Sequence, residues 1–303
     1  MTSLVSFTLA LLAALLPAAH AAVADSLGLG PGRGAWRTGV PEEHGLSTAE
    51  LAAAAAAVQA RAAERYCLVV VKDGVIVHES YFANTSESIY ESDSLAKTFT
   101  AALVGVAVQQ GLVDIDQPLA DMPGMKPHAN WSANGVDYFP RATARNLLSQ
   151  SSGYGVVPPG ERLTYSSDFF TQELSHLLTA ATRAKTNRSG GAIQWASDNF
   201  ATPLGLPELY AYDGLGEEIS ATGGQMMSCR DAARVGQLVV NEGVWLDNDG
   251  KPYQMADRGY MRQVLEPAVP GKIDGYGGSS SPGFVIAVAA ELYCVAWCVA
   301  QAS

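Results

Sequence analysis

A serine and a lysine stand three positions apart at the start of an apolar, alanine-rich run. They are Ser94 and Lys97 in the segment YESDSLAKTFTAAL, residues 90 to 103. On a helix, positions three apart share one face, with Cβ atoms roughly 5–6 Å apart, so the Lys97 amine can reach the Ser94 hydroxyl. The spacing predicts a nucleophilic serine with a lysine as its base. The alternative is two ordinary polar residues on a surface helix, because this tetrapeptide also arises by chance.

Both roles need help from the surrounding structure. An unperturbed lysine has a pKa of about 10.4, so only about one molecule in a thousand carries a neutral amine near pH 7.4. Burial or a neighbouring cation must lower that pKa before Lys97 can accept a proton. Ser94 lies in the first turn of the predicted helix, where backbone N–H groups lack an intrahelical partner. One such N–H group can form half of an oxyanion hole.

Two helices are predicted in this half of the chain. Residues 41–63 carry a capping signal at Ser47, with Glu50 three residues later, and then run as an alanine-rich helix. The helix that contains the serine and the lysine extends to about Gln110, where Gly111 ends it.

A β-hairpin is predicted between these two helices. The β-branched runs Tyr66–Lys72 and Val75–Phe82 flank Asp73 and Gly74. Asp-Gly between two such runs is among the strongest short-range hairpin signals.

The remaining segments predict an α/β fold with an inserted helical subdomain. From residue 141 to 209 the strand signal disappears, and short helical stretches alternate with loops rich in Gly, Pro and Ser. Residues 228–243 form another helix with glycine at its end. We place the insertion at about residues 115–215.

The chain resembles the serine β-lactamase-related superfamily, in its branch of class C β-lactamases, D-alanyl-D-alanine carboxypeptidases and related esterases and amide hydrolases. The resemblance extends from about residue 41 to residue 276. Five segments carry it in the family's order: SLAKTFTAALVGVAVQQGLVDIDQPLADMPG, TARNLLSQSSGYG, PPGERLTYSSDFF, TPLGL and SATGGQMMSCRDAARVGQLVVNEG. It implies a β-lactamase/transpeptidase-like fold with the active site between the subdomains and an antiparallel sheet.

The resemblance also implies roles for individual residues. Ser94 is the expected nucleophile, Lys97 the activating base, and the Ser94 amide one oxyanion donor. Tyr165 is the expected relay that takes the serine proton and then protonates the leaving group. The family's Tyr-x-Asn is replaced here by Tyr165, Ser166 and Ser167. Ser167 can still bind Lys97 or a substrate amide, but with a single hydroxyl where asparagine offers both a donor and an acceptor.

Two other catalytic patterns find little support. Ser197, Asp198 and Asn199 form a literal Ser-Asp-Asn, a triplet typical of other penicillin-binding proteins and β-lactamases. It directly precedes FATPLGL, where the family has an ordinary helix that runs into the TPLGL segment, so we interpret it as a chance match. The histidines at 44, 78, 128 and 176 belong to no metal-binding or Gly-x-Ser-x-Gly pattern. A Ser-His-Asp mechanism is therefore not predicted.

The amino terminus has the pattern of a secretory leader. Residues 4–16 form an apolar stretch, Pro17 breaks it, and Ala19-His20-Ala21 is a small-x-small cleavage site. We therefore expect a signal peptide at residues 1–21, a β-lactamase-related domain at 22–278 and a secreted or extracytoplasmic protein. A buried core helix is the alternative interpretation of the leader.

Composition excludes several classes of protein. A hydrophobic content of 48% with 16% charged residues is typical of a globular chain with a sizeable core. The net charge of −11, without a cluster of Lys and Arg, argues against nucleic-acid binding. The four cysteines, at 67, 229, 294 and 298, are too scattered for a disulfide framework, and we expect free thiols.

The last 25 residues depart from the family. Its third motif, Lys-Thr-Gly or His-x-Gly on a strand, supplies the second oxyanion amide and a group that binds carboxylates. The segment 279–303, SSSPGFVIAVAAELYCVAWCVAQAS, contains no Lys, Arg or His. Three interpretations stay open for this divergent apolar tail: a membrane anchor, a strand or helix that covers the sheet, or a truncated or altered gene product. Glu291 within residues 284–300 weighs against the anchor.

The sequence thus predicts a secreted serine hydrolase that cleaves a small-molecule or peptide-like ester or amide through an acyl-enzyme on Ser94. Because the third motif is missing, we expect weak activity. The alternative is a catalytically inactive binding protein that keeps the fold. Neither a metal nor an organic cofactor is implied.

Overall fold

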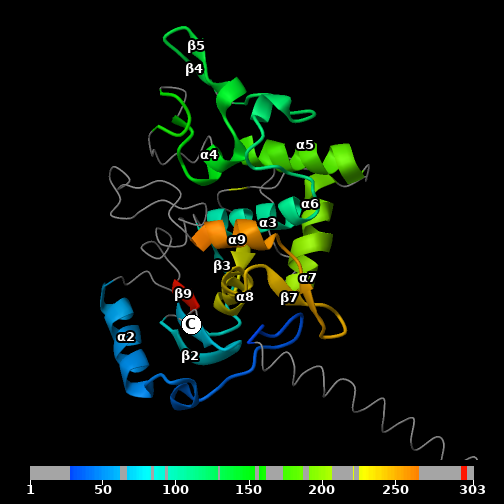
Figure 1. Ribbon diagram of the computed structural model, residues 1–303. Helices are drawn as coiled ribbons and strands as arrows, with labels where there is room; N and C mark the ends of the chain where they lie inside the picture. The colour runs from blue at the N-terminus through cyan, green and yellow to red at the C-terminus, as the bar shows by residue number, and fades with distance from the viewer. Residues whose placement is uncertain are drawn as a thin grey trace, which may run out of the picture.

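The structure is a computed structural model of the 303-residue chain. It describes residues 28–61, 67–82, 85–92, 95–128, 130–153, 157–161, 173–186, 191–206, 221, 225–265 and 295–298. Figure 1 shows the arrangement of the elements, with the sheet at one end, α3 near the middle and the helical part at the other end.

The predicted hairpin is present. Strands β1 (Cys67–Lys72) and β2 (Val75–Tyr81) pair antiparallel around Asp73 and Gly74. Both turn residues have positive φ, 52° and 72°, as a two-residue hairpin turn with the twist of the strands requires. Successive residues of β1 face opposite sides of the sheet, and both sides are buried, which explains the continuous apolar run.

A third strand, β9 (Val295–Cys298), lies parallel to β1 and gives the sheet order β2-β1-β9. The family resemblance implied an antiparallel sheet, and the pairing of β9 differs from that expectation. Of the three interpretations of the tail, these four residues adopt the strand that extends the sheet. No helix among the described residues is long and apolar enough to cross a membrane.

Helices cover both faces of the sheet (Figure 1). Helix α2 (Thr48–Arg61) packs on one face through Leu51 and Ala55, after the short helix η1 (Pro41–His44). The Glu50 N–H group donates to Ser47 Oγ at 3.3 Å, so the predicted cap of α2 is confirmed. Helix α8 (Cys229–Val240) covers the opposite face.

Helix α3 (Ala96–Gln109) is the centre of the main core. Every residue from 96 to 107 is buried, so the helix is surrounded on all sides. Helix α9 (Arg258–Leu265) packs closely against it at Gly105, where a Cβ atom would lie 2.9 Å from Tyr260 Cδ1. Gly111, with φ 65°, follows the end of α3 as predicted.

The described residues between α3 and α8 form a mostly helical part of the structure. Its helices are η3 (Leu119–Asp121), η4 (Phe139–Arg141), α4 (Ala144–Leu148), α5 (Leu174–Thr186), α6 (Gly191–Ala196), η7 (Ser197–Ala201) and α7 (Thr202–Leu204). A small hairpin of β4 (Ser132–Ala133) and β5 (Val136–Asp137) also lies here. Asn134 and Gly135 form its turn with positive φ.

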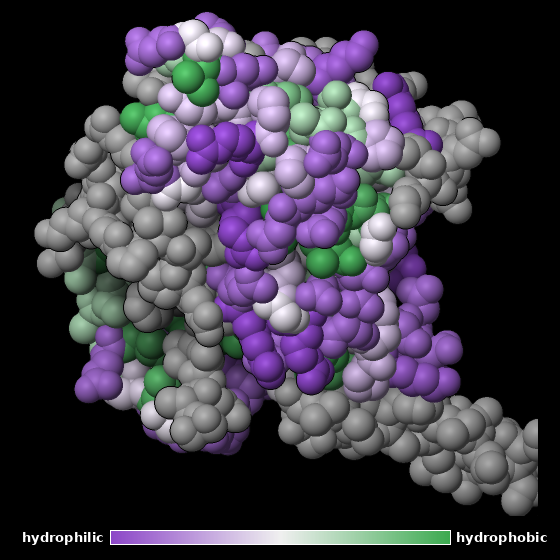
Figure 2. All heavy atoms as spheres, turned by 45° about the horizontal axis from the view of Figure 1, so that its top comes forward, coloured by the Kyte–Doolittle hydropathy of each residue, from purple (hydrophilic) through white to green (hydrophobic). Residues whose placement is uncertain are grey.

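Two further short strand pairs complete the described structure. Strand β3 (Tyr90–Glu91) pairs with β6 (Met226–Met227), and β7 (Val244–Leu246) pairs with β8 (Pro252–Gln254). Figure 2 shows a molecular face that is mostly polar, with apolar side chains in small, separate groups. The large apolar clusters consist of buried residues, around α3 and on both faces of the sheet.

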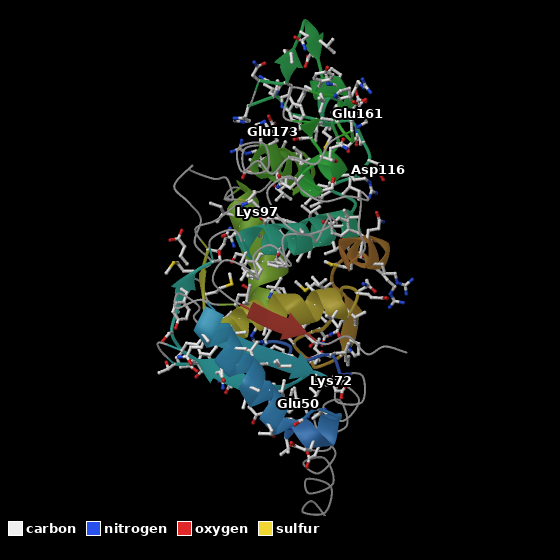
Figure 3. All side chains as sticks on the ribbon, turned by 90° about the vertical axis from the view of Figure 1, so that its left-hand side faces the viewer. Glu50, Lys72, Lys97, Asp116, Glu161 and Glu173 are labelled. Carbon is white, nitrogen blue, oxygen red and sulfur yellow. A yellow bond between two sulfur atoms is a disulfide. The ribbon has the colours of Figure 1, made fainter. Side chains whose placement is uncertain are left out.

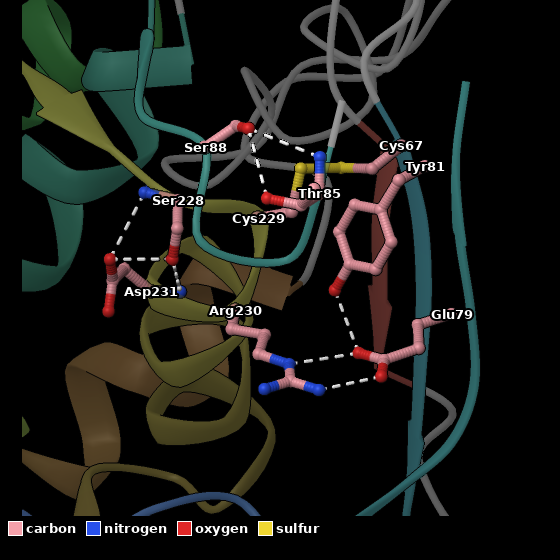
Figure 4. The surroundings of a disulfide bond; sticks show 9 residues. All are labelled: Cys67, Glu79, Tyr81, Thr85, Ser88, Ser228, Cys229, Arg230 and Asp231. Carbon is pink, nitrogen blue, oxygen red and sulfur yellow. Dashed lines mark hydrogen bonds and ion pairs between the residues drawn. A yellow bond between two sulfur atoms is a disulfide. The ribbon is translucent and has the colours of Figure 1, made fainter. Parts of the chain in front are cut away.

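The expectation of free thiols is wrong for two of the four cysteines. Cys67 of β1 and Cys229, the first residue of α8, form a disulfide with Cα atoms 6.6 Å apart (Figure 4). The two residues are 162 positions apart in the chain, so only the packing of α8 on the sheet brings them together. The disulfide thus ties the sheet to the start of α8.

An ion pair joins the same two elements next to the disulfide. Arg230 binds the Glu79 carboxylate through two nitrogens, at 2.6 and 2.9 Å, and the Tyr81 hydroxyl donates to the same carboxylate (Figure 4). Burial alone would raise the pKa of Glu79, but these hydrogen bonds hold it below its usual value.

Reduction of the disulfide is expected to lower the free energy of unfolding by about 2–4 kcal/mol, because the bond closes a very long loop in the unfolded chain. Denaturant unfolding of the oxidised and reduced protein measures this difference. A Cys294→Ser/Cys298→Ser variant is the control and should keep the full effect of reduction. Equal unfolding midpoints for the oxidised and reduced protein would contradict the expectation.

Candidate active site

Lys97 lies in the first turn of α3 and is almost completely buried. Only 1% of Lys97 is exposed, and its neighbours Ala96 and Phe99 belong to the apolar core. Figure 3 shows Lys97 on α3, with the sheet on one side and the helical part that carries Glu173 on the other. Burial disfavours a charged ammonium group. Burial is one of the two conditions that the sequence analysis set for a lysine base.

The other sequence-predicted site residues lie outside the described residues. Ser94 falls between Ser92 and Leu95, which are described, and Tyr165 and Ser167 fall between residues 161 and 173. The structure thus places Lys97 and the chain on both sides of Ser94.

The chain that leads into α3 is held by a buried pair of residues. The Ser92 N–H group donates to the Gln225 backbone oxygen at 2.8 Å, and the Ser92 hydroxyl donates to Gln225 Oε1 at 3.3 Å. Gln225 is 0% and Ser92 is 8% exposed. These bonds continue the pairing of β3 with β6, in which Tyr90 lies opposite Met227.

The same distant segment also contacts α3 after the lysine. The Thr100 hydroxyl donates to the Ala221 backbone oxygen at 2.9 Å. Thr100 comes three positions after Lys97 and so lies on the same face of the helix. The segment that contains residues 221 and 225–227 therefore contacts the chain both before Ser94 and after Lys97.

A small pocket lies beside this contact, at the start of α3 and α8. Its lining residues are Tyr90, Glu91, Ser92, Leu95, Met227, Ser228, Cys229 and Ala232. Ser228 closes it at the cap of α8, where its side chain and that of Asp231 bond reciprocally to each other's backbone N–H groups. The predicted start of this helix is confirmed.

The Ser-Asp-Asn triplet lies at the opposite end of α3. Asn199 of η7 accepts a hydrogen bond from Gln110 Nε2 at 2.9 Å and donates to the Trp195 backbone oxygen. Gln110 follows Lys97 by thirteen residues, which is about 20 Å along a helix. The triplet is thus part of a helix and far from the lysine, which supports its interpretation as a chance match.

The histidines have contacts on two separate parts of the structure. His44 bonds to Asp73 at 2.9 Å and His78 to Ser80 at 3.0 Å on the hairpin, and burial lowers the pKa of His78. In the helical part, His128 and His176 pack edge to face, with ring centroids 4.5 Å apart. In the described ranges, no group of three or more His, Cys, Asp or Glu side chains is arranged to hold a metal ion.

Two polar features beside the core were not found from the sequence. Ser92 and Gln225 are 133 positions apart, and no local pattern links them. In the turn after α4, all four residues from Ser149 to Ser152 are at most 3% exposed, and the Ser149 and Ser151 hydroxyls lie 2.8 Å apart. An unusually polar segment within an apolar stretch was the available signal for this turn.

A family model described as Beta-lactamase matches residues 51–277, and this range includes α3, the helical part and α8. The chain belongs to the Beta-lactamase family. Its family and its structural neighbours are hydrolases of the β-lactamase-related type, and its fold is β-lactamase/transpeptidase-like. The resemblance seen in the sequence is confirmed at this level. No curated protein matches the sequence.

Three solved structures are similar to this chain, and the two with TM-scores above 0.5 illustrate the similarity in fold. A β-lactamase from Mycobacterium bovis has 19% identity and a TM-score of 0.45, over 67% of this chain and 62% of that chain. An octameric penicillin-binding protein homologue from Pyrococcus abyssi has 18% identity and a TM-score of 0.53, over 78% and 64%. The hydrolase EstCE1, which has promiscuous acyltransferase activity, has 15% identity and a TM-score of 0.54, over 78% and 82%. The chain therefore spans less than two thirds of the length of the first two.

A Lys97→Met variant is expected to lose serine acylation by a factor of about 10²–10⁴, because it removes the base and keeps a linear apolar side chain. The second-order rate of labelling by a fluorophosphonate measures the loss. Lys72→Met is the matched control: Lys72 lies on the hairpin, 3.4 Å from Asp73, and its replacement should leave the rate unchanged. Equal labelling of the Lys97→Met variant and the native protein would exclude Lys97 as the base.

Proposed function

We propose that this chain is an extracytoplasmic serine hydrolase that cleaves an ester or amide through an acyl-enzyme on Ser94. The observation that carries the proposal is Lys97, which is buried in the first turn of α3 and follows Ser94 at the spacing Ser-x-x-Lys, in a chain of the Beta-lactamase family. Burial of a lysine costs free energy, and a buried lysine three positions after a candidate nucleophile is a candidate functional residue.

The proposed reaction has two stages. Ser94 Oγ attacks the carbonyl carbon, and its proton passes to Lys97, with Tyr165 as the relay. The tetrahedral intermediate then collapses, the acyl group stays on Ser94, and the leaving alcohol or amine departs with a proton from Tyr165. Water attacks the acyl-enzyme in the same way, which releases the acid and restores the Ser94 hydroxyl. Ser167 would bind Lys97 or a substrate amide.

We expect this activity to be weak in the 303-residue chain. Loss of one oxyanion donor typically costs about 10²–10³ in rate. The Ser94 amide can supply one donor, but residues 279–303 contain no Lys-Thr-Gly or His-x-Gly to supply the second. The same residues offer no cation for a substrate carboxylate. Small activated esters are therefore better candidate substrates than carboxylate-bearing β-lactams.

Two observations support an extracytoplasmic location. The first is the leader pattern of residues 1–21. The second is the Cys67–Cys229 disulfide, since disulfides persist mainly in oxidising compartments. The proposed partner is a small-molecule or peptide-like substrate, and the proposal includes neither a nucleic acid nor a cofactor. Residues 295–298 of the tail pair with β1, so the proposal does not include membrane anchoring; a need for detergent during extraction would contradict this part of the proposal.

A second candidate function is a catalytically inactive binding protein of the same fold. The replacement of Tyr-x-Asn by Tyr165-Ser166-Ser167, together with the divergent tail, favours this candidate. It predicts substrate binding without a covalent intermediate, so the acylation experiment below separates the two.

A fluorophosphonate is expected to label the native protein at a single serine, Ser94, with loss of fluoride. Intact-mass measurement and peptide mapping identify the site. Ser94→Ala should abolish labelling, whereas Ser197→Ala, in the Ser-Asp-Asn triplet, should leave it unchanged. Labelling that persists in Ser94→Ala would exclude this nucleophile, and an unlabelled native protein would favour the binding protein.

Tyr165→Phe should lower the rate of p-nitrophenyl acetate hydrolysis by about 10² or more, because it removes the relaying hydroxyl and keeps the aromatic ring. Initial rates measure the change, and circular dichroism checks that the variant is folded. Asp198→Ala is the control, with an unchanged rate expected. The reverse result, a loss in Asp198→Ala alone, would transfer the role to the Ser-Asp-Asn triplet.

A further inference from the structure

We propose that Gln225 is a positioning residue that fixes the start of α3 and thereby sets the distance between the serine and lysine of the active site. This inference rests on the proposed function. Gln225 acts through Ser92, two positions before Ser94, and needs no contact with substrate.

The first step is the pair of hydrogen bonds between Gln225 and Ser92. The Gln225 backbone oxygen accepts from the Ser92 N–H group, and the Gln225 side-chain oxygen accepts from the Ser92 hydroxyl. One residue thus holds both the main chain and the side chain of the other. Both are buried, so water does not compete for these groups, and each bond constrains the chain more strongly than at the surface.

The second step is the reach of the segment that carries Gln225. Strand β6 of this segment pairs with β3, which precedes Ser94 in the chain. The Ala221 backbone oxygen accepts a hydrogen bond from the hydroxyl of Thr100, which follows Lys97. The Ser-x-x-Lys turn lies between these two attachments in sequence. A shift of this segment would therefore move the start of α3.

The third step is the anchor of the segment itself. Met227 leads directly into Ser228, the cap of α8, and then into Cys229, which is bonded to Cys67 of β1. Figure 4 shows the cap, the disulfide and the Arg230–Glu79 ion pair together at this end of α8. The sheet and α8 thus provide a fixed base from which Gln225 holds Ser92.

The chemistry explains why this position matters. A base must lie within about 2.6–3.2 Å of the proton that it removes, and a misplacement of about 1 Å can cost about 10²-fold in rate. Leucine has nearly the volume of glutamine but cannot accept from the Ser92 hydroxyl. A Gln225→Leu variant therefore removes the side-chain bond to Ser92 with little change in side-chain size.

The test measures fluorophosphonate labelling and p-nitrophenyl acetate kinetics in Gln225→Leu, in Ser92→Ala and in the double variant. Each single variant is expected to lower the labelling rate and kcat by about 10–10², with KM nearly unchanged. The double variant should be as active as the less active single variant, because both single variants remove the same hydrogen bond. Ser92→Thr keeps the hydroxyl and should retain most of the activity.

Gln237→Leu is the matched control. Gln237 is also a buried glutamine, 4% exposed, but its amide bonds to the Gly28 backbone oxygen and to Asn241, away from the start of α3. Its replacement should lower the melting temperature and leave the labelling rate unchanged. A purely structural role for Gln225 would give the same pattern in Gln225→Leu, and that result would overturn the inference.

Hydrogen exchange separates this inference from the proposed function. Peptides that cover residues 92–100 should exchange faster in Gln225→Leu than in the native protein and Gln237→Leu. If the native protein is not labelled, the proposed function fails, and faster exchange in Gln225→Leu alone still supports the positioning role. If labelling of Ser94 is normal in Gln225→Leu and exchange is unchanged, the positioning role fails and the proposed function stands.

Discussion

The burial of Lys97 in a helix that is enclosed on every side is the constraint on which the structure depends. An amine has no place in an apolar core unless polar groups or chemistry offset the cost of removing it from water. The rest of α3 compensates by close packing: twelve consecutive residues are buried, and Gly105 allows Tyr260 of α9 to approach. The polar groups are concentrated at the start of the helix, where Ser92 and Gln225 lie.

The parts of the fold that depend on neighbouring residues were predictable. Asp73-Gly74 specified the hairpin because both turn residues need positive φ. Ser228 with Asp231 specified the start of α8, and Gly111 the end of α3, because helix ends have unsatisfied backbone groups that particular residues satisfy. The family resemblance then ordered these elements and pointed to Lys97 before its burial was known.

The contacts between distant residues were not predictable. Four cysteines allow three pairings, and the chemistry of Cys67 and Cys229 says nothing about which is formed. Parallel pairing of β9 with β1 depends on a long crossover that leaves no local pattern. The role of Gln225 also could not be predicted from the sequence, because its partner Ser92 lies 133 positions away. In each case the tertiary arrangement decides.

Helix α8 connects the sheet to the segment that leads into α3. One face of this helix packs on the sheet through Cys229 and Ala233, so its position is set by the largest β element in the structure. Strand β6 leads into this helix through Ser228, and β6 pairs with β3, the strand that leads toward Ser94. A movement of α8 on the sheet must therefore reach the start of α3 through only a few bonded residues. For this reason, the geometry of the proposed active site depends on the stability of the sheet layer.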